Sequence, residues 1–323
     1  MDSRARNDLS NAILRTSSRR DGTSDLTATF PGRYTHATMS TTHAEDVHSG
    51  ERFAFGTNWA NFLRVLSDAR INEAEQSLRR MLNVENLRGK HVLDVGSGSG
   101  LFSLAARRLG ATVHSFDYDP ESVACTKELR RRNDPMDADW TVERGSVLDS
   151  DYLQSLGSWD IVYSWGVLHH TGSMWEALGN VAPLVKPSGL LFIAIYNDQR
   201  GLSAWWKSLK RIYNRLPKLL RTPYALAVMG PHEFMRFIGV TARSRDPRTY
   251  FINIRRYAEI SGRGMSYWHD IIDWIGGYPF EVATPEAILD FYAAREFQLI
   301  KLKTCGGRLG CNEFVFRRST AHA

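Results

Sequence analysis

A glycine-rich stretch with two nearby carboxylates is the part of the chain whose residue types best suit ligand binding. His91–Gly100 reads His-Val-Leu-Asp-Val-Gly-Ser-Gly-Ser-Gly, and Asp117 follows 21 residues after Gly96. Glycines at the end of an apolar run let a ligand approach the backbone, and the amides of a following helix point toward it. A carboxylate at Asp117 can accept hydrogen bonds from both hydroxyls of a ribose. This spacing predicts a nucleoside site.

Two details of the loop distinguish between kinds of nucleoside ligand. A dinucleotide fingerprint requires glycine, or tolerates alanine, at the position that Leu101 occupies. The carboxylate of Asp94 would repel a pyrophosphate but attract a cation. We therefore expect a nucleoside with a cationic tail, and we place a dinucleotide-dependent oxidoreductase last among the enzyme classes.

Candidate acid–base groups follow two apolar stretches, 160–164 and 190–196. His169 and His170 come shortly after the first stretch, and Tyr196 and Asn197 come at the end of the second. Imidazole has a pKa suited to accepting a proton near neutral pH. We expect His169 or His170 to orient or deprotonate an acceptor group that Tyr196 and Asn197 help to hold, with a buried structural role as the alternative. We find no zinc or calcium motif and predict no metal site.

Alternating strands and helices must position these residues. The predicted strands are His91–Val95, Thr112–Asp117, Trp140–Glu143, Asp160–Ser164 and Leu190–Tyr196. Helices between them, such as Leu101–Leu109 and Pro120–Arg132, indicate a parallel sheet covered on both faces. In such sheets, ligands bind beyond the carboxyl ends of the strands. The binding point lies between the first and fourth strands, where the strand order reverses.

The end of the chain departs from this alternation. A helix is predicted at Pro285–Arg295, followed by strands at Gln298–Lys303 and Asn312–Arg317. Because a short glycine-rich turn joins the two strands, we expect an antiparallel hairpin.

The glycine loop together with Asp117 resembles the class I S-adenosylmethionine-dependent methyltransferases. The resemblance covers roughly Arg52 to Arg318 and continues in Gly145–Asp149, Trp159–His170 and Leu184–Gly189. It implies an α/β fold with a Rossmann-like, doubly wound seven-stranded sheet whose last strand is reversed. It also implies S-adenosylmethionine as the cofactor.

Position by position, the resemblance assigns cofactor contacts along the strand ends. The residues concerned are Asp94, Gly96, Gly98, Asp117, Tyr118, Ser146, Val147 and Trp165. Asp94 and the glycine loop would lie along the methionine part, and Asp117 would take the ribose. Many relatives have an acid where this chain has Ser146, so here that hydroxyl or Asp149 must accept from the adenine amino group. Plain core packing is the alternative for Tyr118 and Trp165.

A second aromatic and acidic stretch lies downstream, around a Gly-Gly-Tyr-Pro turn. Its candidate acceptor-binding residues are His269, Asp270, Asp273, Tyr278 and Glu281. They could line an acceptor pocket, or they could form an interface between a helical insertion and the sheet, or between subunits.

The formal net charge of +6 is unevenly distributed. Arg200–Arg263 contains 14 Lys and Arg but three acids, which leaves the remaining chain slightly acidic. Four interpretations of this basic insertion are open. It could be a lid whose arginines clamp an anionic acceptor, a nucleic-acid surface, a surface for an anionic membrane that takes up a lipid acceptor, or a solvated face.

These observations predict an organisation and a function. We expect a flexible tail over residues 1–50 (or a transit peptide), a helical cap over 51–89, the cofactor-binding core over 90–199, a helical lid insertion over 200–263 and the rest of the sheet over 264–323. Three cysteines and no apolar span predict a cytoplasmic protein. We predict methyl transfer to O or N of a small polar or anionic metabolite. The alternatives are an RNA-modifying methyltransferase, which would bind nucleic acid, and a catalytically silent cofactor-binding scaffold; the oligomeric state is open.

Overall fold

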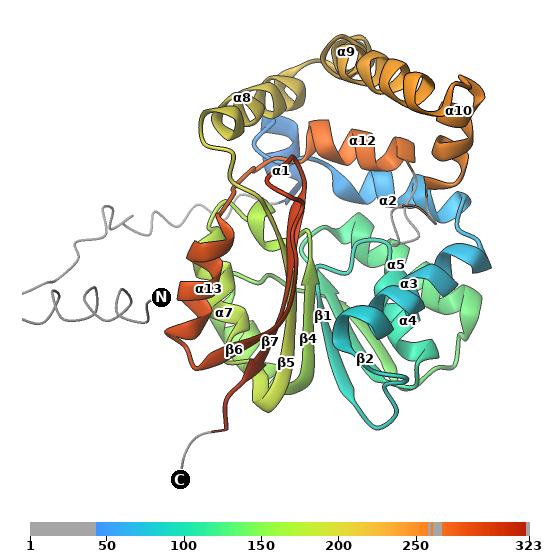
Figure 1. The fold of residues 1–323 in the computed structure, drawn as a ribbon. Coiled ribbons are helices and arrows are strands. Elements are labelled where there is room, and N and C mark those ends of the chain that lie inside the picture. The colour runs from blue at the N-terminus through green and yellow to red at the C-terminus, as the bar shows by residue number, and fades with distance from the viewer. Residues whose placement is uncertain (1–42, 258–259, 261–266, 321–323) are drawn as a thin grey trace, which may run out of the picture. The chain divides into compact units, whose positions relative to one another are not determined.

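A seven-stranded sheet forms the centre of the computed structural model, which describes residues 43–257, 260 and 267–320, except for the side chains of Trp268 and His269. The strand order is β3-β2-β1-β4-β5-β7-β6 (Figure 1). The strands are β1 (His91–Val95), β2 (Thr112–Asp117), β3 (Trp140–Arg144), β4 (Trp159–Trp165), β5 (Val185–Tyr196), β6 (Phe297–Lys303) and β7 (Cys311–Arg318). The first five are parallel, and β7 runs antiparallel to both β5 and β6. The predicted fold class is confirmed.

The largest difference from the predicted strands is at the start of β5. We predicted that this strand begins at Leu190, but it begins at Val185, which pairs with Trp159 of β4 across an irregularity in the register. Ser188 has a φ of 62°, and a Cβ on Gly189 would lie 2.8 Å from a backbone oxygen. The Pro-Ser-Gly sequence thus bends the strand without ending it.

Apolar side chains on both faces of the sheet form its core. Neighbouring residues of β1 point to opposite faces, so Val92 belongs to one buried cluster and Leu93 to the other. The first face is covered by α3 (Asp68–Leu82), α4 (Leu101–Arg108) and α5 (Pro120–Asn133). The second is covered by α6 (Ser150–Ser155), α7 (Met174–Val181) and α13 (Pro285–Ala293). Burial on both faces explains the continuous apolar strands of the sequence.

Two helices precede α3, and the first lies within the segment that we predicted as a tail. Residues 1–42 lie outside the described part of the structure, but α1 (His43–Ser49) is helical, with the ring of His43 buried 3.6 Å from Asp119. In α2 (Phe55–Arg64), the Gly56 N–H donates to Asp119 at 2.7 Å. These tertiary contacts, which the polar composition did not reveal, order the segment.

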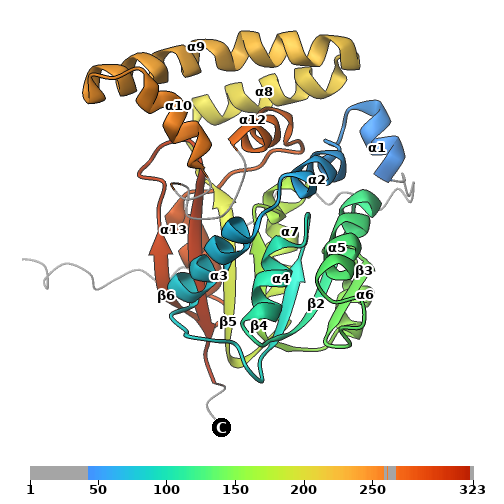
Figure 2. The same ribbon diagram turned by 90° about the vertical axis from the view of Figure 1, so that its right-hand side faces the viewer.

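The basic insertion is helical, as predicted. It contains α8 (Gly201–Arg215), α9 (Lys218–Ser244) and α10 (Arg248–Arg255), beyond the carboxyl ends of the parallel strands (Figures 1 and 2). We assigned residues 264–323 to the sheet, but α12 (Tyr267–Gly276) instead packs on α8 and α2, with Ile275 buried against Phe53 and Tyr213. We call α8, α9, α10 and α12 the helical layer. Among the described residues, no helix has both the length and the apolar character needed to cross a membrane.

Lys210 of α8 is a fully buried amine inside the helical layer. Its Nζ donates to the carbonyl of Trp274 and lies 4.4 Å from the centroid of that residue's ring and 4.7 Å from the ring of Phe280. Burial lowers the pKa of Lys210 to about 7, although the nearby carboxylate of Asp273 opposes this shift. The lysine therefore joins α8 to α12, and its charge is costly to keep there.

We expect Lys210→Met to flatten the dependence of stability on pH. Between a folded pKa near 7 and the ordinary value of 10.5, the unfolded chain binds more protons than the folded chain. The free energy of unfolding of the wild type should therefore rise with pH by up to about 1.4 kcal/mol per unit. Urea unfolding at several pH values above 7 measures this slope.

The matched control is Lys218→Met, since Lys218 lies exposed at the start of α9. Its slope should equal that of the wild type. If Lys210→Met also retains the wild-type slope, the amine of Lys210 is not held uncharged by its surroundings.

Candidate functional site

A cavity of about 880 Å³ lies between the carboxyl ends of the parallel strands and the helical layer. The loops after β1 to β5 form one side, and residues of α2, α9 and α12 form the other. The cavity includes the switch between β1 and β4, where ligands bind in sheets of this type. Its volume lies in the upper part of the usual range for small-molecule pockets, about 300–1,000 Å³.

The glycine loop lines the cavity and has no room for side chains. Gly96 has a φ of 78°, and a Cβ there would lie 2.4 Å from the side chain of Val167. Gly98 has a φ of 55°, and its Cβ would lie 2.9 Å from Nε1 of Trp59 on α2. Asp117 fixes the loop because its Oδ2 accepts from the Gly98 N–H at 2.9 Å. The backbone is thus presented directly to a ligand.

A buried carboxylate, Asp94, and a half-buried one, Asp117, stand beside this loop. Burial raises the pKa of Asp117 to about 6, although backbone N–H groups, including that of Asp119 at 2.9 Å, oppose the shift. Burial also raises the pKa of Asp94 to about 7, despite a hydrogen bond from the hydroxyl of Ser103. A cation bound nearby would favour the ionised form of both groups. The site is therefore electrostatically suited to a cationic ligand.

Tyr118 and Ser146 line the far end of the cavity. The guanidinium carbons of Arg52 and Arg144 lie 5.0 and 5.7 Å from the centroid of the Tyr118 ring. The hydroxyl of Ser146 accepts from the Leu148 N–H at 3.2 Å. Together with Val147 these residues form a wall with one flat ring and one hydroxyl.

Asp149 is the other candidate for accepting from an adenine amino group. Instead, it caps the N-terminus of α6, because its side chain accepts from the Tyr152 N–H at 3.0 Å. Asp149 is not among the described residues that line the cavity. Of these two alternatives, only Ser146 faces the cavity.

The adjacent histidines, in the short 3-10 helix η1 (Leu168–His170), have different surroundings. His170 lines the cavity, and its Nδ1 lies 2.6 Å from the carbonyl of Pro279, so Nδ1 carries the proton and Nε2 the lone pair. Burial lowers the pKa of His170 to about 3. His169 is fully buried, does not line the cavity, and accepts from the Tyr196 N–H at 3.4 Å. Of the two, only His170 can contact a ligand.

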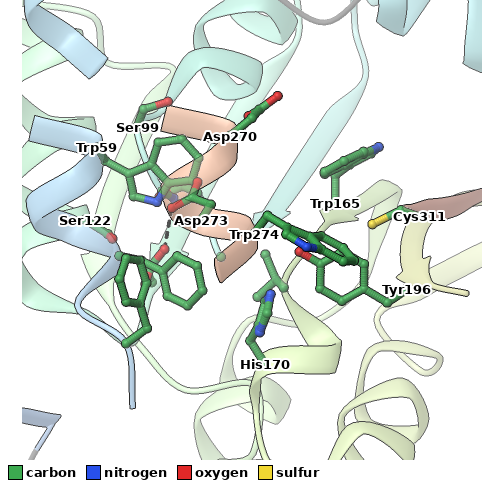
Figure 3. A pocket seen from close by; sticks show the side chains of 18 of the residues that line it. Trp59, Ser99, Ser122, Trp165, His170, Tyr196, Asp270, Asp273, Trp274 and Cys311 are labelled. Carbon is green, nitrogen blue, oxygen red and sulfur yellow. Dashed lines mark hydrogen bonds between the residues drawn. The ribbon is translucent and has the colours of Figure 1, made fainter. Parts of the chain in front are cut away.

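Aromatic rings lie beside His170, with the ring centroids of Phe55 and Tyr196 at 4.9 and 5.4 Å. The rings of Tyr196 and Trp274 are 5.1 Å apart, and in Figure 3 they lie together with His170, while Asp273 lies toward Trp59. Asp273 accepts from Asn58 of α2 at 2.7 Å. This end of the cavity can hold a flat, polar molecule.

Several residues that we predicted for the acceptor site have structural roles. Asn197 accepts from Asn312 at 3.0 Å and thereby attaches the hairpin to β5. The hydroxyl of Tyr278 accepts from the guanidinium of Arg211 at 2.6 and 2.9 Å. Glu281 accepts from the first N–H of α7 at 3.1 and 3.2 Å. In the described part of the structure, none of these side chains lines the cavity.

Of the predicted acceptor-binding residues, Asp270 and Asp273 line the cavity. The side chain of His269 lies outside the described residues. One of the four interpretations of the insertion was a lid whose arginines clamp an anion, but none of its described arginines lines the cavity. The arginine cluster that is absent from the wall consists of Arg243, Arg245, Arg248, Arg255 and Arg256. The side of α9 that faces the cavity contributes His232 and Glu233 instead.

Trp59, Arg52 and Trp274 also line the cavity, although we did not predict a site role for them. For residues 51–89, which include Trp59 and Arg52, we predicted only a helical cap. No local signal indicates that α2 passes over the glycine loop.

Comparison with known proteins adds to this description. A family model described as "Methyltransferase domain" matches residues 66–229. A ubiquinone biosynthesis O-methyltransferase of Coxiella burnetii is 27% identical over 179 residues, which are 54% of this chain and 66% of that protein. One of the same name from Xanthomonas campestris is 38% identical over 111 residues, 34% of this chain and 45% of that protein. The chain thus spans less than two thirds of either relative.

Among solved structures, the magnesium protoporphyrin IX methyltransferase of Synechocystis with bound SAH is similar in fold. It is 15% identical, the match covers 77% of this chain and 83% of that one, and the TM-score is 0.46.

Proposed function

Because the chain belongs to the class I S-adenosylmethionine-dependent methyltransferase family, we propose that it transfers a methyl group from S-adenosylmethionine to an oxygen or nitrogen atom of a small polar acceptor. One observation carries this proposal. The residues assigned to the cofactor and those able to hold an acceptor, such as Asp117 and His170, line a single cavity.

The residues present fit S-adenosylmethionine. The ribose hydroxyls would donate to Asp117, the adenine would lie beside Tyr118 and Ser146, and the methionine part would follow the glycine loop near Asp94. The loop would present bare backbone to the methionine part, and its glycines are also required by packing, because side chains there would overlap Val167 and Trp59. When bound, the cofactor supplies an electrophilic methyl group on a sulfonium that is already a good leaving group.

The chain itself would contribute alignment and orientation. Nε2 of His170 would accept a hydrogen bond from the acceptor hydroxyl and direct the oxygen lone pair toward the methyl group. As the O–CH3 bond forms and the S–CH3 bond breaks, the hydroxyl proton, which the methylated oxygen holds only weakly, would leave through this hydrogen bond to water. A pKa of about 3 makes His170 a weak base, so orientation is favoured over proton abstraction. Tyr196 and Trp274 would hold the body of the acceptor, and such positioning accounts for much of the acceleration of an in-line displacement.

The charges of the cavity wall favour a polar acceptor with a flat apolar body over an anionic one. The helical layer contributes Asp270 and Asp273 to the wall, together with Glu233, which is paired with Arg236 at 3.4 Å. The cations of the wall are paired as well, Lys303 with Glu313 at 2.9 Å and Arg52 with Asp46 at 3.5 Å. The name of the two curated relatives, ubiquinone biosynthesis O-methyltransferase, supports oxygen as the accepting atom.

Calorimetric titration and a labelled-methyl assay test the proposed function. S-adenosylmethionine and S-adenosylhomocysteine should bind and NAD should not, because the loop carries Leu101 and Asp94. With fractionated cell extract as the acceptor source, label should enter the small-molecule fraction. Binding of NAD alone would refute the cofactor assignment, label in RNA alone would favour the RNA-modifying alternative, and binding without transfer would favour a silent scaffold.

A further inference from the structure

The outer face of α9 is apolar and exposed along its length. Leu219, Leu226 and Phe234 are 86%, 68% and 63% exposed, and Met235 and Ile238 are 65% and 43% exposed. Successive intervals of seven, eight and four residues bring Leu219, Leu226, Phe234 and Ile238 onto one side of the helix. In both ribbon views α9 lies on the side of the helical layer away from the sheet (Figures 1 and 2). Soluble proteins seldom expose an apolar surface of this extent without a partner.

The charged residues in the middle of α9 make contacts within the protein. His232 and Glu233 line the cavity, and Arg236 donates to the hydroxyl of Tyr267 at 2.6 Å. Exposed basic residues lie instead at the two ends of the helix, with Lys218 at its start and Arg243 in its last turn. Further exposed arginines follow in the loop and α10, and they are Arg245, Arg248 and Arg255. An apolar stripe about 29 Å long thus lies between Lys218 at one end and a group of arginines at the other.

We propose that the outer face of α9 docks on an anionic lipid bilayer. An amphipathic helix with an apolar face and basic flanks lies in the plane of the interface, where its apolar side chains enter the acyl boundary and its cations meet the phosphates. A second copy of this chain would be a poorer occupant. Pairing two such faces would bring together two insertions that each carry 14 basic and three acidic residues between Arg200 and Arg263.

Docking would also bring the cavity close to the bilayer. Met229, His232 and Glu233 of α9 form part of the cavity wall. If the proposed methyltransferase function holds, the acceptor would then be a polar group on a lipid-soluble molecule. This last step rests on the proposed function, whereas the docking itself does not.

Vesicle co-sedimentation of the full chain tests the docking. We expect binding to vesicles of equal parts phosphatidylglycerol and phosphatidylcholine, and about tenfold weaker binding to phosphatidylcholine alone. The double variant Leu226→Ser, Phe234→Ser should lose at least about tenfold in binding, because two apolar anchors are removed. Met136→Ser is the matched control, since Met136 is 85% exposed but lies far from the helical layer in sequence.

Other measurements separate docking from folding and from catalysis. The thermal unfolding midpoint and the affinity for S-adenosylhomocysteine should be unchanged in the double variant, since neither residue lines the cavity. Lys218→Gln with Arg243→Gln should weaken binding to anionic vesicles and leave the weak binding to neutral vesicles unaltered. The proposal is overturned if the wild type binds no vesicles, if the double variant binds as well as the wild type, or if Phe234→Ser instead dissolves a dimer seen by sedimentation velocity.

Discussion

Replacing Asp117 with alanine is expected to weaken S-adenosylmethionine binding by at least about 100-fold. The carboxylate would accept from two ribose hydroxyls, and hydrogen bonds to a charged group contribute about 1.5–3 kcal/mol each. The same substitution leaves the Gly98 N–H without the acceptor that now lies 2.9 Å away. The loss should therefore appear in the calorimetric dissociation constant of both S-adenosylmethionine and S-adenosylhomocysteine, because each contains the ribose.

Two further variants make this result specific. Asp117→Asn keeps the shape of the side chain and removes its charge, so it should show an intermediate loss with a higher unfolding midpoint than the alanine variant. Asp139→Asn is the matched control, because that carboxylate is 65% exposed and does not line the cavity as described. An Asp117→Ala protein that is folded and binds the cofactor within threefold of the wild type would contradict the ribose assignment.

Replacing His170 with alanine is expected to lower kcat by about 100-fold, within the range found for groups that assist proton movement or orient the reacting atom. The variant removes the imidazole ring, which lines the cavity and carries its lone pair on Nε2 because Nδ1 is held 2.6 Å from the Pro279 carbonyl. Cofactor affinity should change little, because the Asp117 end of the cavity is left intact. His170→Gln should recover part of the rate, since its amide oxygen can also accept.

The pH profile and the neighbouring histidine separate orientation from general-base catalysis. With a pKa of about 3, His170 should contribute no ionisation to kcat/KM between pH 5 and 8, so the shape of the profile should be the same in His170→Gln. His169→Gln should lower the unfolding midpoint and leave kcat of the folded protein close to the wild-type value, because His169 is fully buried and does not line the cavity. Unchanged turnover in both His170 variants would overturn the assignment.

The strands and the glycine loop could be predicted because their signals are local. β1 and β2 have the predicted bounds, and Asp117 ends β2 beside the loop that follows β1. Parallel strands that are neighbours in a sheet end at the same edge, so sequence spacing alone brings Gly96 and Asp117 together.

The acceptor end could not be predicted in the same way. Its walls come from helices whose rotation depends on contacts across the chain, such as the one from Asn58 to Asp273, 215 residues away. Successive residues of a helix are rotated by about 100° from one another, so the composition of a helix does not say which of its residues face a cavity. The basic composition of the insertion therefore did not reveal that Glu233 would line the cavity. For the same reason Lys210 looked like one more surface charge, although it is fully buried.

The sequence by itself therefore determined the sheet, the antiparallel hairpin and the loop with its two carboxylates. These features are signalled by strand alternation and glycine spacing, which are both properties of short segments. Only the tertiary structure decided which of two adjacent histidines meets the ligand. It also decided that α12 rather than the insertion's arginines lines the acceptor end, and that α9 turns its apolar side away from the protein. Each of these outcomes depends on how helices from distant parts of the chain pack against one another, which is not encoded in any one segment.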